Sequence, residues 1–381
     1  MSVNIYLDNA ATTPLMPEAD IAMRRYYSED FFNPSAVYSK SKRVKEKLEE
    51  ARNVIAGLIG AREQEIYFTS GGTESDNWAV NEGVLRRGHI ITDAIEHKAV
   101  LNPIKNYIKA GGAADFIGVT REGFINPADI KRKILRNTVL ISVMTANNEI
   151  GTIQPIAQMS RIAHEYDVLF HTDAVQAFGH IPLNVDDLGV DMLSASSHKF
   201  NGPKGVGFIY IRKDSGVRPF MCGGGQEKGM RAGTENVAGI IGMAEAARIS
   251  CERLEQSAAY CRKICRHMTN RIMSEIPDTI INGTTDAYKR LPGNMSFGFG
   301  GVDAQSLLVL LDMHGISAAA GSACTSDSAG YSHVLEAVKT PAEYIGGTLR
   351  LSIDAKITRQ QADYVVSVLR EIIKNIRSKN N

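Results

Sequence analysis

Two residues of this chain that can do chemistry each follow a short apolar run, and they lie 26 positions apart. Lys199 comes after residues 191–195, and Asp173 comes after residues 168–172. A lysine in such a setting is easily desolvated, which lowers its pKa and makes its amine nucleophilic. A lysine that forms a Schiff base and an acid that holds a pyridinium nitrogen are the main protein contributions to pyridoxal phosphate chemistry. The pair therefore predicts that cofactor, against the plainer alternatives of a solvated lysine and a turn-capping carboxylate.

A glycine-rich turn at residues 70–75 supplies a candidate phosphate site. The turn joins a predicted strand to a predicted helix, and it contains Gly72 and Thr73. Glycines let the backbone approach a ligand closely, and the free N–H groups of a helix N-terminus attract anions. Ser196 and His198, which lie close to the lysine in the sequence, are further donors for phosphate oxygens. Such turns are common, so this one carries weight only beside the lysine and the aspartate.

Three more polar residues lie beyond strand-like runs. His97 comes after residues 92–96, Asn148 comes after residues 139–144, and Gln176 lies three positions beyond the aspartate. A histidine in this place could stack on the cofactor ring and move protons near neutral pH. The glutamine could hydrogen-bond a ring hydroxyl. The alternatives are a surface histidine, a surface glutamine and an asparagine that only makes a turn.

Cys324 is the cysteine with a functional setting. It lies in residues 318–330, where small and polar residues dominate. Such a segment buries little surface, so we expect it to be mobile, whereas a structural cysteine is usually buried among apolar neighbours. The other cysteines are interpreted as core or left unassigned: Cys261 and Cys265 share an apolar helical stripe, and Cys222 and Cys251 have no supporting context.

Short apolar runs alternate with helical patterns along most of the chain. Runs that are apolar on both faces, separated by helical segments, are typical of a mostly parallel sheet covered on both sides. We therefore predict an α/β fold, in which ligands bind beyond the carboxyl ends of the strands. The strand-like runs are 66–69, 89–92, 139–144, 168–171, 191–195 and 206–211.

The chain also shows a change of pattern after its middle third. The helical pattern from residue 236 to about 276 contains no proline and is long enough to cross a domain boundary, and new strand-like runs follow it. We predict a large domain of residues 15–255 and a smaller α+β domain made of residues 1–14 and 256–381.

Composition argues against several classes of partner. The 381 residues include 43 Lys and Arg and 42 Asp and Glu, a net charge of +1, which gives no support for a nucleic-acid or membrane-surface partner. No apolar run approaches the length of a membrane span, and residues 1–9 lack the pattern of a secretory signal. The five scattered cysteines argue against a disulfide framework, so we expect a reducing compartment such as the cytoplasm. No metal is predicted.

Several segments, taken in order, resemble those of a known family. They are 6–14 (YLDNAATTP), 70–77 (SGGTESDN), 146–151 (ANNEIG), 171–176 (HTDAVQ), 197–199 (SHK), 223–227 (GGGQE) and 231–237 (RAGTENV). The chain looks like a cysteine desulfurase of the NifS/IscS type, within the class V aminotransferase-like group of fold-type I pyridoxal phosphate enzymes. The likeness runs from Tyr6 to the terminal helix, so it covers nearly the whole chain.

The resemblance implies a role for each predicted site residue. Lys199 would hold pyridoxal phosphate as a Schiff base, Asp173 would pair with the pyridine nitrogen, and His97 would stack on the ring. The segment with Thr234 would reach the phosphate of a neighbouring subunit, which implies a homodimer with shared sites. The other implied contacts are those of Gln176 and Asn148 with the ring, and those of Gly72, Thr73, Ser196 and His198 with the phosphate.

The reaction that the resemblance implies removes sulfur from L-cysteine. The substrate displaces Lys199 from the cofactor, and Lys199 then helps to move the α-proton. The thiolate of Cys324 attacks the substrate sulfur, which leaves a persulfide on Cys324 and releases alanine. Arg350 would clamp the substrate carboxylate with its planar fork, with Asn148 also at the substrate; the alternative is a surface arginine on an edge strand. An acceptor protein of unknown identity, in iron–sulfur cluster assembly or thiolation, would take the sulfur.

The segment after Cys324 departs from the family pattern. Asp327 stands where a glycine is common, and Gly330 and Tyr331 stand where a Glu-Pro pair is common. These changes leave the acceptor and the rate open rather than the chemistry.

Three other functions compete with desulfuration. They are transamination, selenocysteine lysis and a non-catalytic role as a sulfur carrier. Cys324 argues against transamination, and the presence of Lys199, Asp173, Cys324 and Arg350 together argues against a carrier. The sequence does not separate selenocysteine from cysteine as the substrate.

Overall fold

The central feature of the fold is a seven-stranded sheet. The structure, a computed structural model, describes residues 4–321 and 331–380. Strand β8 is antiparallel to both of its neighbours and the other pairings are parallel, which confirms the predicted mostly parallel α/β sheet. In order across the sheet, the strands are β2 (Ile66–Thr69), β8 (Gly207–Ile211), β7 (Met192–Ser196), β6 (Leu169–Asp173), β5 (Thr138–Ser142), β3 (His89–Asp93) and β4 (Ala114–Ile117).

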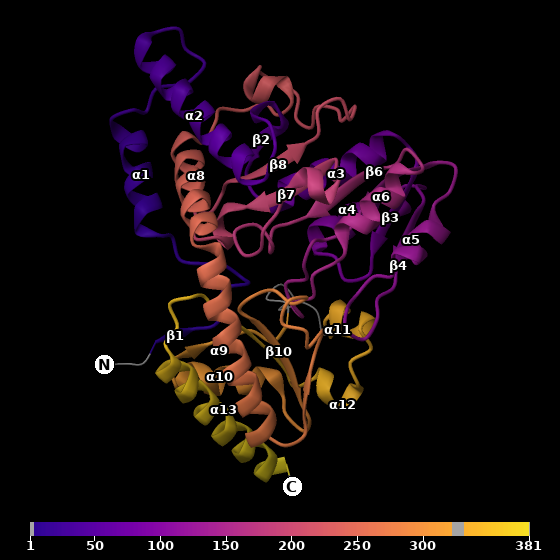
Figure 1. Cartoon of the computed structure of the whole chain (residues 1–381), viewed down its shortest axis with the longest axis vertical. Coiled ribbons are helices and arrows are strands. Elements are labelled where there is room, and N and C mark those ends of the chain that lie inside the picture. The colour runs from indigo at the N-terminus through magenta and orange to yellow at the C-terminus, as the bar shows by residue number, and fades with distance from the viewer. Residues whose placement is uncertain (1–3, 322–330, 381) are drawn as a thin grey trace.

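Helices cover both faces of this sheet because its strands are apolar on both faces. Successive side chains of a strand point to opposite sides, and β3 shows the result: Ile90 shares a buried cluster with Trp78, and Ile91 shares a different one with Phe170. The helices that contribute to the first cluster are α3 (Gly72–Leu85) and α4 (Lys98–Lys109), and those of the second include α2 (Ser39–Leu58), α6 (Ile156–His164) and α8 (Val237–Glu252) (Figure 1).

A second sheet lies below the first in the view of Figure 1 and has its own hydrophobic cluster. Its strands are antiparallel, in the order β12 (Thr348–Ser352), β10 (Asn294–Phe299) and β9 (Thr279–Ile281). Strand β1 (Ile5–Tyr6) pairs in parallel with β11 (Ile316–Ser317), so the N-terminal strand joins this C-terminal part of the chain. The helices of this layer are α9 (Leu254–Glu275), α10 (Ala304–Met313) and α13 (Arg359–Asn380).

Helix α9 corrects one prediction and confirms another. The sequence predicts a single helix from residue 236 to about 276, but the structure has two helices there. The backbone of Arg253, with φ of −95° and ψ of 2°, leaves the helical conformation between α8 and α9. Cys261 is buried in the second hydrophobic cluster and Cys265 packs against it, which confirms their placement in the core.

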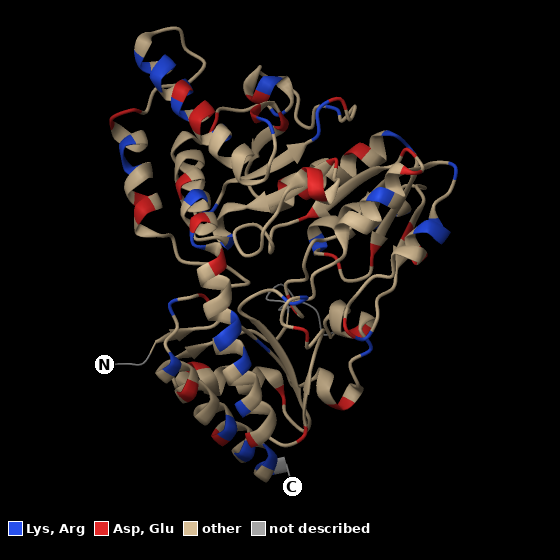
Figure 2. Ribbon diagram, in the orientation of Figure 1, with Lys and Arg blue, Asp and Glu red and all other residues tan. Residues whose placement is uncertain are grey.

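The remaining helices pack outside the elements described so far. Lys and Arg lie among Asp and Glu along outward-facing helices such as α2 and α13, in keeping with the balanced charge (Figure 2). No helix within residues 4–321 and 331–380 is both long enough and apolar enough to cross a membrane. The remaining helices are α1 (Pro17–Ser28), α5 (Pro127–Lys133), α7 (Val185–Leu188), α11 (His333–Ala337) and α12 (Ala342–Ile345).

Candidate active site

A cavity of about 280 Å³ lies beyond the carboxyl ends of β3, β5, β6 and β7, where the sequence predicts a ligand site. The N-terminus of α3 and strand β12 of the second sheet also reach it. The predicted site residues that line this cavity are Gly72, Thr73, His97, Asn148, Asp173, Gln176, Ser196, His198, Lys199 and Arg350. Folding therefore brings together residues that are spread from position 72 to position 350.

The turn that begins α3 packs closely against the chain at the ends of β6 and β7 because it contains two glycines, Gly71 and Gly72. A Cβ added at Gly72 would lie 2.6 Å from Cγ2 of Val175 and 3.5 Å from Cβ of Ser196. Gly71 before it has a φ of +149°, a conformation that residues with a side chain rarely adopt. The first N–H groups of a 14-residue helix thus reach the cavity, and they form a favourable place for an anion.

Lys199 is held by the N-terminal segment. The residue ends a short 3₁₀ turn that follows β7. Its Nζ donates to the carbonyl oxygens of Ala10 at 2.7 Å and Ala11 at 2.8 Å. Nε2 of Gln176 donates to the same Ala10 carbonyl at 2.9 Å. The segment 6–14, to which the sequence assigns no role in the site, therefore forms one wall beside the amine.

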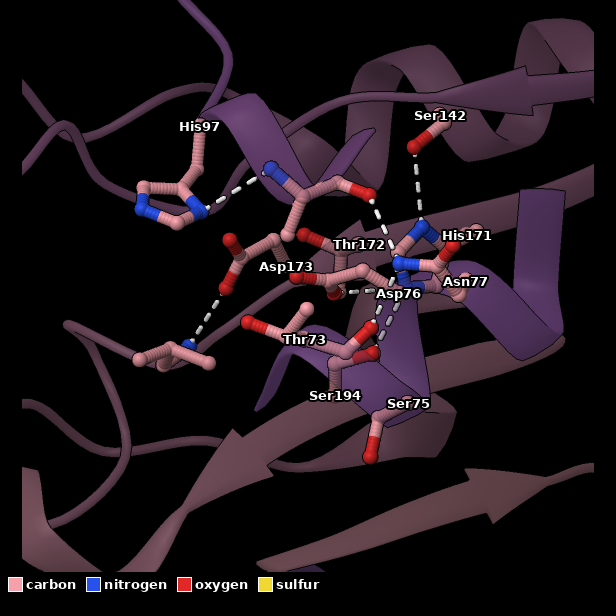
Figure 3. Close-up of polar contacts among 12 residues, drawn as sticks. Thr73, Ser75, Asp76, Asn77, His97, Ser142, His171, Thr172, Asp173 and Ser194 are labelled. Atoms are coloured by element: carbon pink, nitrogen blue, oxygen red, sulfur yellow. Dashed lines mark hydrogen bonds and ion pairs between the residues drawn. The ribbon is translucent and has the colours of Figure 1, made fainter. Parts of the chain in front are cut away.

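His97 has a fixed ring orientation. It is the N-cap of α4, and its Nδ1 accepts a hydrogen bond from the Ala99 N–H at 3.1 Å. Because Nδ1 is an acceptor, Nε2 carries the proton of the neutral ring. Burial lowers the pKa of His97, so the ring is neutral near pH 7. Figure 3 shows this ring and the Asp173 carboxyl on the same side of the polar network.

Asp173 is a buried carboxyl at the end of β6. Only 5% of the residue is exposed, and its Oδ1 accepts from the Val175 N–H at 2.8 Å. Burial raises the pKa of Asp173, and the nearby His97 and Lys199 oppose that rise. A buried carboxylate is stabilised by a cation placed beside it. The site is thus suited to a group that carries a positive charge next to Asp173.

Three further acids, which the sequence analysis missed, lie buried around Asp173. Burial raises the pKa of Asp76, Asp93 and Glu96, that of Asp93 to about 7. Both carboxyl oxygens of Glu96 are buried without a hydrogen-bond partner, and this side chain lines the cavity. The signal was present, because Asp93 ends β3 as Asp173 ends β6. Nothing local to the sequence shows that their carboxyl groups gather at one place.

His171 joins the same buried polar network as these acids. Nδ1 of His171 lies 2.8 Å from Oγ of Ser142, and its Nε2 lies 2.9 Å from Oγ of Ser194 (Figure 3). Burial lowers the pKa of His171 to about 3, so the ring does not offset the acids with a positive charge near neutral pH. This part of the site thus combines buried acids, whose pKa values are raised, with a histidine that stays neutral.

Arg350 is buried rather than exposed, although β12 is an edge strand. The residue is 1% exposed, and its Nη2 lies 2.5 Å from Oδ1 of Asp8. Its Nη1 donates to the Asn148 carbonyl at 3.2 Å, and its buried Nε has no hydrogen-bond partner. One N–H of the guanidinium thus has no hydrogen-bond partner among the described residues. The alternative of a surface arginine is wrong, and the ion pair with Asp8 was not predicted.

One predicted site residue, Thr234, lies away from this cavity. Thr234 lines a separate cavity of about 140 Å³, together with Arg231 and Glu235, and it is not among the residues around Lys199. Cys324 lies outside the described residues. Among the other cysteines, burial raises the pKa of Cys251 to about 11 and those of Cys261 and Cys265 to about 12, which leaves these thiols protonated.

Comparisons with known proteins agree with this arrangement. The family model of the class-V aminotransferases matches residues 5–365. A protein of Dictyoglomus turgidum named cysteine desulfurase IscS is 45% identical, over 99% of this chain and 96% of its own length. A protein of Methanosarcina thermophila with the same name is 44% identical, over 98% of this chain and 93% of its own length.

Solved structures resemble the whole fold. A structure described as a NifS-like protein superimposes with a TM-score of 0.91 at 34% identity, over 98% of this chain and all of its own. Another, described as SspA in complex with cysteine, gives a TM-score of 0.82 at 32% identity, over 93% of this chain and all of its own. The extent of these matches, together with the cavity at the strand ends, shows that the chain belongs to the class-V aminotransferase family and, within it, to the cysteine desulfurases.

Proposed function

We propose that the protein is a pyridoxal phosphate-dependent cysteine desulfurase, which converts L-cysteine to L-alanine and passes the sulfur through a persulfide on Cys324 to an acceptor protein. The observation that carries this proposal is the meeting of Lys199, Asp173 and Arg350 at one cavity. An amine, a buried carboxylate and a buried guanidinium are the groups needed for a carbonyl cofactor, its ring nitrogen and an amino acid carboxylate.

The described residues fit the cofactor. Asp173, whose pKa is raised by burial, would hold the proton of the ring nitrogen and would gain a countercharge. The α3 N-terminus at Gly72, with the hydroxyls of Thr73 and Ser196, would bind the phosphate. Burial lowers the pKa of His198 to about 4, so its ring would take part there as a neutral donor. Gln176 and Asn148 would contact the ring, and the ring of His97 would stack on it.

Each step of the reaction can be assigned to a residue of this chain. When bound, pyridoxal phosphate supplies an electron sink that makes the α-hydrogen of an amino acid acidic. Lys199, oriented by the Ala10 and Ala11 carbonyls, would take that proton at Nζ and return it later. Arg350, with Asn148, would hold the substrate carboxylate, and its unpartnered Nε is an available donor.

The last step needs a thiolate, and no cysteine is among the described residues that line the cavity. Cys324 would attack the substrate sulfur, so that an S–S bond forms as the C–S bond breaks, and the β-carbon takes up a proton to give alanine. The products are alanine and a persulfide on Cys324, and sulfur and electrons balance without an external oxidant. An acceptor protein, in iron–sulfur cluster assembly or thiolation, then takes the outer sulfur.

We further propose a homodimer in which Thr234 completes the phosphate site of the partner subunit. Its place in a separate cavity supports this, because it is not near Lys199 of its own chain. Large apolar side chains that a subunit interface would cover stand exposed on and after α1: Ile21, Tyr27, Phe31, Val37 and Tyr38. The free cysteines suggest a reducing location, for which we propose the cytoplasm.

We also keep the predicted domain division as a proposal. The separate hydrophobic clusters around the two sheets support a large domain of residues 15–255 and a smaller one of residues 1–14 and 256–381. Lys199 and Asp173 then come from the large domain, and Arg350 and Cys324 come from the smaller one. The active site would lie between the two.

The direct test is turnover of L-cysteine by the cofactor-loaded protein in the presence of a thiol. We expect equal amounts of alanine and sulfide. Cys324→Ser should keep the absorption of the bound cofactor and lose persulfide formation, while Lys199→Ala should lose the covalent attachment of the cofactor. Sulfide release by Cys324→Ser at the wild-type rate would contradict the proposal. Transfer of the amino group to a keto acid would indicate a transaminase instead.

A further inference from the structure

We infer that Glu149 is a positioning residue, which holds the chain on both sides of the cysteine segment against the active-site cavity. The inference rests on the proposed function. Glu149 follows Asn148 in the loop after β5 and is 1% exposed. Its side chain lines the cavity on one side and contacts the smaller sheet layer on the other. The sequence analysis assigns it no role.

The chain just after the segment is tied to this carboxylate. Oγ of Ser332 donates to Oε2 of Glu149 at 2.5 Å, across 183 positions of sequence. The same Oγ accepts from the N–H groups of Val334 at 3.2 Å and Leu335 at 3.5 Å, and so it caps α11. The hydroxyl hydrogen is thus used for Glu149 and the oxygen lone pairs for the helix. One serine orients α11 and anchors it to the cofactor side of the molecule.

The chain just before the segment meets the same oxygen. A Cβ added at Gly321 would lie 3.1 Å from Oε2 of Glu149, and Gly321 has a φ of +68°. Two residues earlier, the Ala319 carbonyl accepts from the Arg350 N–H at 2.6 Å, so this stretch also runs beside the arginine. Gly321 and Ser332, the described residues at or next to the ends of the segment that contains Cys324, therefore converge on one buried carboxylate.

A second contact supports the same attachment. Nε2 of His333 lies 2.9 Å from the carbonyl oxygen of Glu96, directly before His97. The start of α11 is therefore joined to the loops that follow β3 and β5. A thiol attack depends on the approach of the reacting atoms, and small displacements reduce its rate strongly. Glu149 is thus the group that fixes the described chain before and after the segment that contains Cys324.

The test compares two reactions of the cofactor-loaded protein. Persulfide formation on Cys324 from L-cysteine needs the positioned cysteine segment. Exchange of the α-hydrogen of L-alanine for deuterium, followed by NMR, needs Lys199 and Arg350 but no thiol. The variants are Glu149→Ala, Ser332→Ala, the double variant and Glu149→Gln, whose amide oxygen still accepts from Ser332. Asp303→Ala is the matched control, because it removes the N-cap of α10 in the same layer without contact to the cavity.

We expect Glu149→Ala and Ser332→Ala each to slow persulfide formation about tenfold or more, equivalent to about 1.4 kcal/mol in the barrier. The loss in the double variant should be smaller than the sum of the single losses, because each single variant already removes the hydrogen bond between Ser332 and Glu149. Deuterium exchange should stay within about twofold of wild type in every variant. Glu149→Gln should recover most of the persulfide rate, and Asp303→Ala should lose none.

A parallel fall of both reactions in the single variants would overturn the inference, since Glu149 would then act within the cavity. Unchanged persulfide formation in Ser332→Ala would overturn it too, as would additive losses in the double variant. Glu149→Gln guards against a simple folding defect in the alanine variant. A wild-type protein that binds the cofactor but releases no alanine from L-cysteine would refute the proposed function, whereas an active wild type with unaffected variants refutes only the role of Glu149.

Discussion

Replacement of Arg350 by lysine tests whether the guanidinium recognises the substrate carboxylate. In the structure, Nη2 of Arg350 pairs with Asp8 and Nη1 donates to the Asn148 carbonyl, while the buried Nε has no partner. A lysine keeps the positive charge, but it offers one ammonium in place of a planar fork with several fixed donors. It cannot hold Asp8, Asn148 and a substrate carboxylate in the same geometry.

The size of the effect follows from the bonds that are lost. A hydrogen bond to a charged group contributes about 1.5–3 kcal/mol, and Arg350→Lys removes at least one such bond to the substrate. The value of kcat/KM for L-cysteine should therefore fall roughly 10- to 150-fold. The absorption of the bound cofactor should not change, because Arg350 is not assigned to hold it.

The assay measures alanine formation over a range of L-cysteine concentrations. Arg370→Lys is a matched control, since this arginine forms an exposed ion pair with Glu275 on the outside of α13 and should contribute little. If Arg350→Lys keeps kcat/KM within about threefold of wild type, the guanidinium does not bind the carboxylate and the assignment is wrong. Loss of cofactor absorption in the variant would also refute the reasoning, because it would place Arg350 at the cofactor.

Three other predictions concern the cofactor cradle, the buried acids and the subunit interface. Gly72→Ala should weaken cofactor binding about tenfold or more, because the new methyl group meets a neighbouring side chain at 2.6 Å; a binding titration measures this, and Gly57→Ala, with nothing within 4 Å, should bind normally. Burial raises the pKa of Asp93 to about 7. The stability that protonated Asp93 gives the cofactor-free protein is therefore present at about pH 4, and it is lost as the pH rises towards 7. In denaturant titrations, the unfolding free energy of Asp93→Asn should therefore rise relative to that of wild type as the pH increases over that range. A difference between the two proteins that does not change with pH would contradict the assignment. Mixing inactive Lys199→Ala and Thr234→Ala subunits should restore part of the activity, since one site of a mixed dimer would be intact; no recovery after subunit exchange would argue against the shared site.

Much of the active site is predictable because it follows a geometric rule. Parallel strands end at one edge of a sheet, so polar residues that follow buried runs must meet there. Asp173, Lys199, His97 and Asn148 all obey this rule, and the structure places each at the cavity. The role of Gly72 is equally predictable from the sequence, because a close contact between the start of a helix and the ends of strands leaves no space for a side chain.

The parts that were missed depend on contacts between distant segments. Asp8 and Arg350 are 342 positions apart, and no periodicity links them. The Ala10 and Ala11 carbonyls that hold Lys199 are backbone groups, so the types of the side chains at these positions do not indicate this role. Asp76 and Glu96 look like ordinary polar positions in their own segments, and only packing shows that they are buried beside Asp173.

The sequence by itself determined the fold class, the cofactor chemistry and the family, because these depend on local patterns: strand-end polar residues, glycine turns and the order of motifs. Tertiary structure alone decided how the second layer takes part. It buried Arg350 beside Asp8, separated Thr234 from Lys199, and brought Gly321 and Ser332 to the Glu149 carboxylate. Burial, ion pairing and the direction of a side chain are set by the whole packed chain, and so they cannot be read from one segment at a time.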